Sequence, residues 1–433
     1  MGFSLASRFR GVIKTCLVLA FLFFAAVQTL HANSEYSPEN HGYNQGIWAL
    51  LGIPYGQVVD VDVDTSTPEN HTNFVGAGSD QFAQEDWQAF GAEPEYLVSR
   101  AEQISSARLT RISDDWAFAN VDGRPTHQYS RRQAWNTNMS MIEVGNAVLD
   151  AHDYRIIVPE IQLSTARVWS RTNPQLMYGI YFGPEPNVVA SWNVLTGALD
   201  RLMTLSDHTD CSFGNQEGNP STNEKVIVAC DHKYNGEKHL IALDLRNRVQ
   251  LGVVQQEWNY NWAGYSDSGD YIIVENNASG APSSLIRYDA NFQNPLPLGR
   301  SSHGDFGRDA DNGGDIYAMI KGDGFEMIRL SDGFRQYLSL SGVSGVGNGH
   351  LSCRSVERSG WCYFSSYGVG GKLGAVRFSF ESPDIEIWGF HRSSSDAYPS
   401  QPKATVSPDG RKILFTSDWY GYGQTTDYVL EID

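Results

Sequence analysis

The chain has 433 residues, of which 41% are hydrophobic, 12% aromatic and 19% charged. This length and this apolar fraction can bury a large core, which excludes a disordered chain and a small disulfide scaffold. The low charge content, together with many aromatic residues and 42 glycines, favours a strand-rich fold with many tight turns. Acidic residues outnumber basic ones by 50 to 32, and the resulting net charge of −18 excludes a nucleic-acid-binding protein.

The first 32 residues have the pattern of an export signal. Arg8, Arg10 and Lys14 precede an apolar run from residue 15 to residue 30, and the segment ends at the small residue Ala32. The alternative is a membrane anchor, but the run is shorter than the roughly 20 residues that a spanning helix needs. We therefore expect a cleaved signal peptide over residues 1–32, a secreted or periplasmic protein and no insertion into the membrane.

Residues 33–110 lie outside the repeats described below, and we expect them to form a leader that packs on the main domain or helps to close it. Within this leader, the acidic stretch at residues 81–101 is a candidate helix. The strand-like sequence SARLTRI at residues 106–112 is a candidate for completing the last repeat, which would tie the two ends of the chain together.

Seven sequence units with similar patterns of strands and turns follow. The clearest unit, at residues 404–433, contains a strand, a Pro-Asp-Gly turn, an apolar strand, a polar loop and a further strand. A weaker copy at residues 261–289 has Ser-Asp-Ser-Gly in place of Ser-Pro-Asp-Gly. The seven units start at His127, Trp169, Cys211, Asn261, His303, His350 and Ala404.

The spacing of these units, roughly 40–50 residues, is typical of propeller blades. We therefore predict an all-β fold, a seven-bladed β-propeller with four-stranded antiparallel blades over residues 111–433. A pair of β-sandwiches is the alternative architecture. The Ser-Pro-Asp-Gly unit at residues 404–417 resembles the TolB-type repeat of bacterial propellers. A closed ring of blades needs no partner subunit, so we expect a monomer.

Two pairs of cysteines flank turn-like sequences, so a disulfide within each pair would cross-link the strands of one hairpin. The pairs are Cys211 with Cys230 and Cys353 with Cys362. Export permits disulfides, but four cysteines allow three connectivities and the pattern does not choose among them. Zinc binding is the alternative, because His208 and His350 each precede a cysteine with the spacing His-x-x-Cys.

Histidines recur at the same phase of several units. The innermost strand of each propeller blade starts at one face beside the central axis, so residues at these starts converge. His127, His303 and His350 open three units, and His208 lies just before a fourth. This pattern predicts a functional site, the alternative being histidines that only fill the funnel with hydrogen bonds. His208, His303 and His350 are also candidate ligands of a structural metal ion, zinc or calcium.

Aromatic and basic residues are frequent near the same predicted loops. Trp262 lies at the start of the fourth unit, and flat aromatic faces suit sugar rings. Arginine forks match carboxylates and sulfates. The arginines that we expect near the histidines are Arg131, Arg132, Arg171, Arg308 and Arg354. On an acidic protein, this combination predicts an anionic substrate that is attracted locally.

The first unit, a histidine followed by YSRRQAWN, and the later Gly-His-x-Ser-Cys-Arg unit resemble exported propeller polysaccharide lyases. Ulvan lyases are the nearest of these and oligogalacturonate lyases are more distant, and the likeness covers residues 120–433. The resemblance implies cleavage of an anionic uronic-acid polysaccharide by β-elimination. In such enzymes a His/Tyr pair removes the proton at C5 and protonates the leaving oxygen, while an Arg, Asn or His neutralises the carboxylate.

Carried onto this chain, the resemblance makes His127 the acid or base. Tyr234, in the loop DHKYNGEKH, is the first choice as its partner, with Tyr265 and Tyr181 as alternatives. This chemistry requires no cofactor.

The resemblance also suggests a substrate-binding set. Asn146 is a candidate for neutralising the carboxylate, and Arg171 and Arg354 are alternatives. His208 and Trp262 complete the expected contacts with the polysaccharide.

Two other function classes remain open at this stage. The main alternative is a non-catalytic, TolB-like periplasmic propeller that binds a protein or a glycan, and the second is another type of propeller hydrolase. The sequence contains no Gly-x-Ser-x-Gly, Walker loop, His-Glu-x-x-His or dinucleotide fingerprint, so the corresponding enzyme classes have no support. A lyase requires His127 within hydrogen-bond reach of a tyrosine around one sugar-sized slot, whereas a binding platform would show a broad apolar or acidic surface.

Overall fold

The computed structural model describes residues 57–60, 92–102, 105–119, 121, 125–164, 166–181, 183, 187–214, 218–256, 260–276, 284–322, 324–339, 346, 348–367, 371–395, 397–421 and 424–432. The chain divides into two units, residues 1–54 and 55–433, and every described residue belongs to the second. The predicted signal peptide therefore lies outside the described residues. Within these ranges, no helix is both long and apolar enough to cross a membrane.

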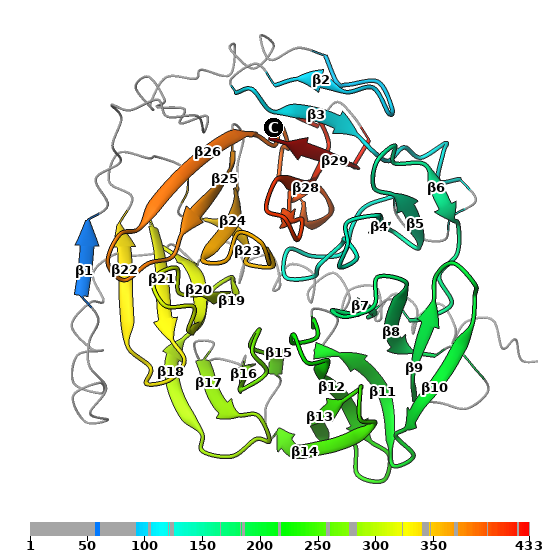
Figure 1. Cartoon of the computed structure of the whole chain (residues 1–433), viewed down its shortest axis with the longest axis vertical. Helices are drawn as coiled ribbons and strands as arrows, with labels where there is room; N and C mark the ends of the chain where they lie inside the picture. The colour runs from blue at the N-terminus through cyan, green and yellow to red at the C-terminus, as the bar shows by residue number, and fades with distance from the viewer. Residues whose placement is uncertain are drawn as a thin grey trace, which may run out of the picture. The chain divides into compact units, whose positions relative to one another are not determined.

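Seven β-sheets of the second unit form a ring of blades, which confirms the predicted all-β propeller (Figure 1). Blade 1 contains β4 (Met141–Val144), β5 (Ala147–Asp150) and β6 (Ile156–Val158). Blade 2 contains β7 (Val168–Trp169), β8 (Leu176–Ile180), β9 (Val188–Asn193) and β10 (Leu199–Thr204). Blade 3 contains β11 (His208–Phe213), β12 (Lys225–His232), β13 (Lys238–Asp244) and β14 (Val249–Gln256). Blade 4 contains β15 (Tyr260–Tyr265), β16 (Tyr271–Asn276), β17 (Ser284–Asp289) and β18 (Leu296–Arg300).

The remaining blades follow the same order of strands, and two of them gain strands from the leader. Blade 5 contains β19 (Gly304–Arg308), β20 (Asp315–Lys321), β21 (Gly324–Arg329) and β22 (Arg335–Ser339), and β1 (Gln57–Asp60) pairs in parallel with β22. Blade 6 contains β23 (Gly349–Ser352), β24 (Trp361–Ser366), β25 (Lys372–Arg377) and β26 (Asp384–Phe390). The short 3-10 helix η3 (Tyr398–Ser400) precedes blade 7. Blade 7 contains β27 (Thr405–Val406), β28 (Lys412–Ser417), β29 (Thr426–Glu431), β3 (Arg108–Arg111) and β2 (Arg100–Ala101).

Blade 1 departs from the four-stranded pattern. Three strands form its sheet, and Trp135 makes an isolated bridge to Ile142 at the position of an innermost strand. The candidate helix at residues 81–101 is wrong for its described part, because residues 92–101 are extended or form turns. Residues 81–91 lie outside the described residues.

The repeated turn has the same hydrogen bonds in two blades. In blade 7, Ser407 N–H donates to Lys412 O at 3.0 Å and Gly410 N–H donates to Ser407 O at 2.9 Å. In blade 4, Ser266 and Gly269 donate the equivalent bonds at 2.9 and 3.0 Å. Both glycines have positive φ, 73° and 79°, which a side chain would disfavour. The Ser-x-x-Gly signature therefore marks a real structural repeat.

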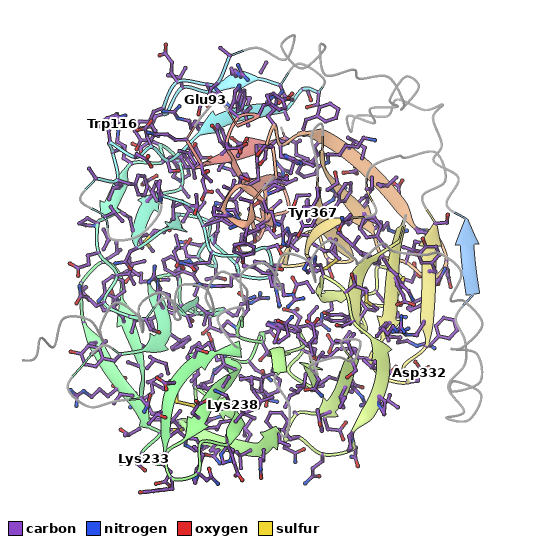
Figure 2. All side chains as sticks on the ribbon, turned by 180° about the vertical axis from the view of Figure 1, so that it is seen from behind. Glu93, Trp116, Lys233, Lys238, Asp332 and Tyr367 are labelled. Carbon is purple, nitrogen blue, oxygen red and sulfur yellow. A yellow bond between two sulfur atoms is a disulfide. The ribbon has the colours of Figure 1, made fainter. Side chains whose placement is uncertain are left out.

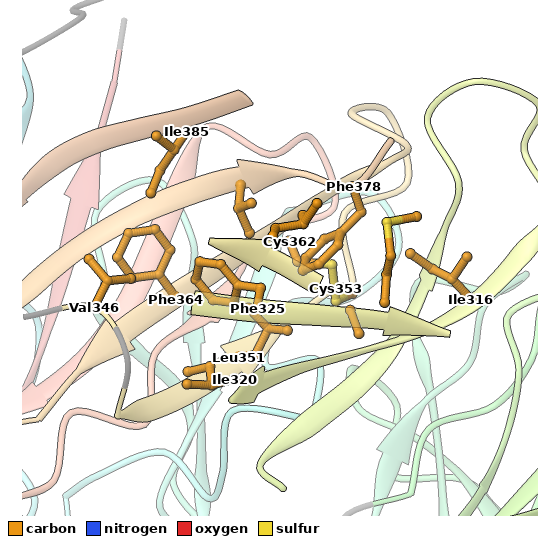
Figure 3. Packing of buried hydrophobic residues seen from close by; sticks show 14 residues of the cluster. Ile316, Ile320, Phe325, Val346, Leu351, Cys353, Cys362, Phe364, Phe378 and Ile385 are labelled. Atoms are coloured by element: carbon orange, nitrogen blue, oxygen red, sulfur yellow. A yellow bond between two sulfur atoms is a disulfide. The ribbon is translucent and has the colours of Figure 1, made fainter. Parts of the chain in front are cut away.

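The inner strands are apolar because each blade is covered by a neighbour on both faces. In β12, the five residues from Val226 to Cys230 are all buried, whereas the outer strand β10 has no buried residue. Side chains fill the spaces between the blades (Figure 2). Figure 3 shows one such interface, where Phe325 of blade 5 lies 5.5 Å from Phe364 of blade 6. Burial on both faces removes the polar-apolar alternation of a half-exposed strand.

Both disulfides form within hairpins, as one of the three sequence-based connectivities predicts. Cys211 pairs with Cys230 between β11 and β12, and Cys353 pairs with Cys362 next to β23 and β24. The sulfur atoms are therefore not thiolates, which overturns the alternative of zinc binding through His-x-x-Cys. Two disulfides are compatible with an extracellular or periplasmic location.

The leader closes the ring through blade 7. As predicted for residues 106–112, β3 pairs antiparallel with β29, with Leu109 opposite Leu430. Asp427 fastens this junction, because its backbone carbonyl accepts from Ile112 N–H at 2.9 Å and its backbone N–H donates to Ser113 Oγ at 2.8 Å. Strands from both ends of the described propeller thus share one sheet.

We predict that Leu109→Ala lowers the free energy of unfolding by about 3 kcal/mol, because it leaves a cavity in a fully buried cluster. The matched control is Val356→Ala, at a residue that is 51% exposed, and its effect should stay within about 0.5 kcal/mol. Chemical denaturation measures both variants. Equal stabilities would show that β3 does not help to hold the ring closed.

Candidate functional site

One segment of blade 1, residues 129–135, lies in the middle of the propeller and forms hydrogen bonds with each of the other six blades. It contains the sequence Tyr-Ser-Arg-Arg-Gln-Ala-Trp, and its two arginines are 2% and 4% exposed. Its hydrogen-bond partners, in order from blade 2 to blade 7, are Arg167, Asn219, Glu275, Gly304, Arg354 and Val406. This segment, called the central segment below, fills the axis of the ring.

Arg131 is the charged centre of this segment. Its Nη2 donates to Glu275 Oε2 at 3.3 Å, and its Nε donates to Gly304 O at 2.5 Å. Its guanidinium lies 4.6 Å from the ring of Trp262 and 5.8 Å from the ring of Tyr129. The charge is thus paired and enclosed by aromatic faces, as a buried cation requires.

Two histidines of neighbouring blades meet beside this segment. His303 immediately precedes β19 and His350 lies in β23, and these inner strands start at the same end of the propeller. Their imidazole rings stack, with centroids 5.0 Å apart and an interplanar angle of 23°. Tyr129 contacts His350 edge-on at 5.0 Å. The repeat phase therefore brings His303 and His350 together, as predicted.

Tyr367 completes the cluster. It follows β24, which runs antiparallel to β23 and returns the chain to the end where His350 lies, with Gly349 opposite Ser366. The hydroxyl Oη of Tyr367 lies 3.0 Å from His350 Nε2 and 3.4 Å from Gln401 Oε1. Figure 2 shows Tyr367 toward the middle of the ring. A histidine-tyrosine pair is thus present at the axial end of blade 6.

His303 offers a basic nitrogen on an exposed residue. Its Nδ1 lies 3.0 Å from Gly349 O, a carbonyl that can only accept, so Nδ1 carries the proton. Loss of water around the ring, and then the positive charge of Arg131, lower the pKa of His303. The ring is therefore neutral at pH 7, and Nε2 has an unshared electron pair on an exposed residue.

His350 is buried, and its Nε2 lies within hydrogen-bond distance of the Tyr367 hydroxyl. Burial, followed by the nearby His303 and Lys403, lowers the pKa of His350 well below its ordinary value. Its Nδ1 is buried and has no hydrogen-bond partner among the described residues. Burial also raises the pKa of Tyr367, so this hydroxyl keeps its proton at neutral pH. The pair can exchange a proton between Oη and Nε2 while Tyr367 remains partly exposed.

His127, the predicted acid or base, has a different environment. Its Nδ1 lies 2.9 Å from Asp427 Oδ1 and its Nε2 lies 2.8 Å from Lys403 O. Both partners are acceptors, so both ring nitrogens are engaged, and the residue is 3% exposed. This geometry assigns His127 to the closure of blade 7 and leaves no ring nitrogen for a substrate.

The predicted tyrosine partners do not contact His127. Tyr234 is 74% exposed at the tip of the β12–β13 hairpin, where its ring lies 5.7 Å from His232. Tyr265 is 1% exposed between blades 3 and 4, and its hydroxyl donates to Ala290 O. Asn146 accepts a hydrogen bond from Arg167 Nη1 at 3.0 Å, so it holds a buried arginine.

The expectation that the arginines gather near the histidines is wrong for Arg171, Arg308 and Arg354. These residues lie at or beyond the ends of β7, β19 and β23, whereas the histidines lie at the starts of β19 and β23. Arg354 is 3% exposed and pairs with Asp305 at 2.5 Å.

Arg171 and Arg308 share one carboxylate, Asp267, at 2.8 and 3.1 Å. Burial alone would raise the pKa of Asp267, but the two guanidinium groups outweigh this effect and lower it. Trp262 is fully buried against Phe306, beneath Arg131. These three predicted substrate contacts, Arg171, Arg354 and Trp262, are thus already occupied by other residues.

The predicted metal ligands do not form one group. His208 contacts His239 in blade 3, with His208 Nε2 3.0 Å from His239 Nδ1, whereas His303 and His350 stack in blades 5 and 6. In the described ranges, no three side chains of His, Cys, Asp or Glu are placed to hold a metal ion. The donor set around the axis therefore does not fit a resident zinc or calcium ion.

Sequence reasoning missed Tyr367, and it gave no role to Gln401 or to Tyr129 of the YSRRQAWN motif. The repeat contains a signal for Tyr367, because a residue directly after the second strand of a blade returns to the end where the first strand starts. Gln401 lies just before the last inner strand, in phase with His303 and His350. Tyr367 belongs to no motif of fixed spacing, so single-residue patterns did not reveal it.

The chain matches no protein-family model and no curated protein. Among solved structures, it is similar to an oligogalacturonate lyase in complex with manganese, with a TM-score of 0.56, 11% identity and coverage of 78% of this chain and 96% of that chain. An oligogalacturonate lyase from Vibrio parahaemolyticus gives a TM-score of 0.53 with the same identity and coverage. TolB from Acinetobacter baumannii gives a TM-score of 0.36 at 9% identity, covering 66% of this chain and 75% of that chain. At these identities, the two lyase likenesses show the fold.

We predict a loss of stability in acid that depends on His391, a fully buried residue before η3. Its Nε2 lies 2.7 Å from Ser366 O, and its Nδ1 accepts from Ser393 N–H at 2.9 Å, so the neutral ring is fully bonded. Burial lowers the pKa of His391 to about 4. This is below the unfolded value near 6.5, so the unfolded chain binds the proton more tightly.

The contribution of neutral His391 to the free energy of unfolding is therefore complete above about pH 6.5. It decreases by up to about 3 kcal/mol as the pH falls toward 4. Thermal unfolding of the wild type and of His391→Gln across this pH range measures it. The variant should show a smaller dependence on pH, while His152→Gln, at an exposed residue, should match the wild type. Identical slopes for His391→Gln and the wild type would contradict the prediction.

Proposed function

We propose that the protein is an exported polysaccharide lyase that cleaves an anionic uronic-acid polysaccharide, ulvan or a related polymer, by β-elimination. The observation that carries the proposal is the 3.0 Å contact between Tyr367 Oη and His350 Nε2, next to the imidazole of His303, whose ring stacks on that of His350. The likeness in fold to oligogalacturonate lyases and the two disulfides support the proposal.

The elimination needs a base for the C5 proton and an acid for the leaving oxygen at C4. His303 Nε2 is the base, because its electron pair is unshared and its residue is exposed. The C5–H electrons form the C4–C5 double bond as the C4–O bond breaks. His303 Nε2 takes up the C5 proton, and Tyr367 donates its proton to the departing oxygen. Water then takes the added proton from His303 and supplies one to the Tyr367 oxygen, which restores both residues.

His350 is a positioning residue in this scheme. At 1% exposure it does not reach the substrate, but it fixes the Tyr367 hydroxyl through Nε2. As a neutral ring it can donate to Oη or accept from it, so it can stabilise the tyrosine as its proton leaves.

The uronate carboxylate requires a positive potential, since its charge opposes removal of the C5 proton. Arg131 and Lys403 supply this potential, and both act on His350 by lowering its pKa. Arg131 also forms an ion pair with Glu275, which holds its guanidinium in place. Its role is therefore to supply an electrostatic field from a fixed position. The scheme contains no step through a metal ion.

We predict that His303→Ala and Tyr367→Phe each lower the rate of elimination by roughly 10²–10⁴-fold, because each removes one proton-transfer group. The measurement is the ultraviolet absorbance of the new C4–C5 double bond on ulvan, pectate, alginate and glycosaminoglycans. Tyr234→Phe is the matched control, at an exposed tyrosine of blade 3, and should retain full activity.

Three outcomes are informative. Activity that survives both site variants would refute the assigned residues while keeping a lyase. Activity that is lost in Tyr234→Phe would return the site to blade 3. No double-bond formation on any polymer would refute the lyase and favour the non-catalytic, TolB-like binding propeller.

A further inference from the structure

Three histidines form a second cluster in blade 3, apart from the stacked pair His303 and His350. His208 begins β11, His232 ends β12 and His239 lies near the start of β13. The strand register places His208 opposite His232 and Cys230 opposite His239. The ring centroids are 4.9 to 5.7 Å apart. The proposed lyase chemistry uses none of the three.

From this geometry we propose that His208 and His239 chelate a divalent late transition-metal ion, such as copper, nickel or zinc, through Nε2 and Nδ1. These atoms are 3.0 Å apart. Two imidazoles that bind one ion at about 2.0–2.1 Å place their nitrogens roughly 3.0–3.4 Å apart. The spacing is thus that of two adjacent ligands, and water completes the coordination at this partly exposed position.

A neighbouring carboxylate favours the tautomer of His239 that chelation needs. A metal binds an imidazole nitrogen that carries no proton. The other ring nitrogen of His239, Nε2, lies 3.8 Å from the Glu237 carboxylate, which favours a proton there and leaves the electron pair on Nδ1.

The scaffold holds the two ligands in place. The Cys211–Cys230 disulfide joins β11 to β12 beside them, and the Asn187 side-chain amide donates to His208 O from blade 2. Figure 2 locates the hairpin by Lys233 and Lys238. A pair fixed in this way loses little conformational entropy on binding.

His232 lies next to His208 and His239, but we do not include it among the metal ligands. Its Nδ1 is 2.7 Å from Asn235 Oδ1, and the described residues contain no group of three His, Cys, Asp or Glu side chains that could hold a metal ion. The proposal is therefore a two-histidine chelate. The competing interpretation of the 3.0 Å contact is a simple N–H···N hydrogen bond.

The test is calorimetric titration of the untagged full-length protein with Cu²⁺, Ni²⁺, Zn²⁺ and Mg²⁺. We expect one site, tightest for Cu²⁺ and absent for Mg²⁺, because imidazole nitrogens prefer late transition metals. His208→Gln and His239→Gln should each weaken binding at least about tenfold, and Glu237→Gln should have a smaller effect of the same sign. A rise in the melting temperature with Zn²⁺ that a chelator reverses is the second readout.

Controls separate this site from the axial histidines. His152→Gln, at an exposed histidine of blade 1, and His303→Gln should bind the metal like the wild type. Melting curves in chelator verify that each variant is folded. Absence of binding in the folded wild type, or binding that survives His208→Gln and His239→Gln, overturns the proposal, as does a site that is lost in His303→Gln.

Discussion

The hydrogen bonds of the central segment are the constraint on which the rest of the propeller depends. Residues 129–135 bond to all six of the other blades, and their arginines carry charges that the fold must neutralise internally. Arg131 meets Glu275 and Arg132 meets Glu143. Removing either carboxylate would take a counter-charge from a buried arginine, which costs more than an exposed ion pair contributes. The segment therefore fixes the blades relative to one axis and fills that axis.

Closure of the ring is coupled to the site through one backbone carbonyl. Asp427 binds His127, and the other nitrogen of that ring faces Lys403 O. Lys403 is buried and adopts a positive φ of 43°, a conformation that costs energy for a residue other than glycine. Its charge lowers the pKa of His350. The bonds that join the chain ends thus also hold a cation beside the proposed proton-transfer pair.

Periodicity revealed the fold, but not the identity of the site residues. The Ser-x-x-Gly turns, the apolar inner strands and the SARLTRI strand depend on local chemistry, so the blades and the closure could be read from the sequence. The phase argument also predicted the meeting of His303 and His350. The same argument did not distinguish His303 and His350 from His127 and His208. The position of a residue in its repeat unit predicts the face of the propeller on which it lies, but not the side chains that it contacts. Asp427, 300 residues away in the sequence, forms a hydrogen bond with His127, and no local sequence pattern predicts that contact.

The charged side chains at the two ends of the inner strands are arranged differently. At one end, Arg171, Arg308 and Arg354 are neutralised by Asp267 and Asp305, so they present little field to solvent. At the other end, the imidazole of His303 is neutral, and the nearby cations Arg131 and Lys403 are buried. Screening limits surface fields to about 8 Å at physiological ionic strength. The net charge of −18 would therefore repel the proposed anionic polymer only weakly beyond this distance. Recognition would then depend on contact geometry, with long-range steering contributing little.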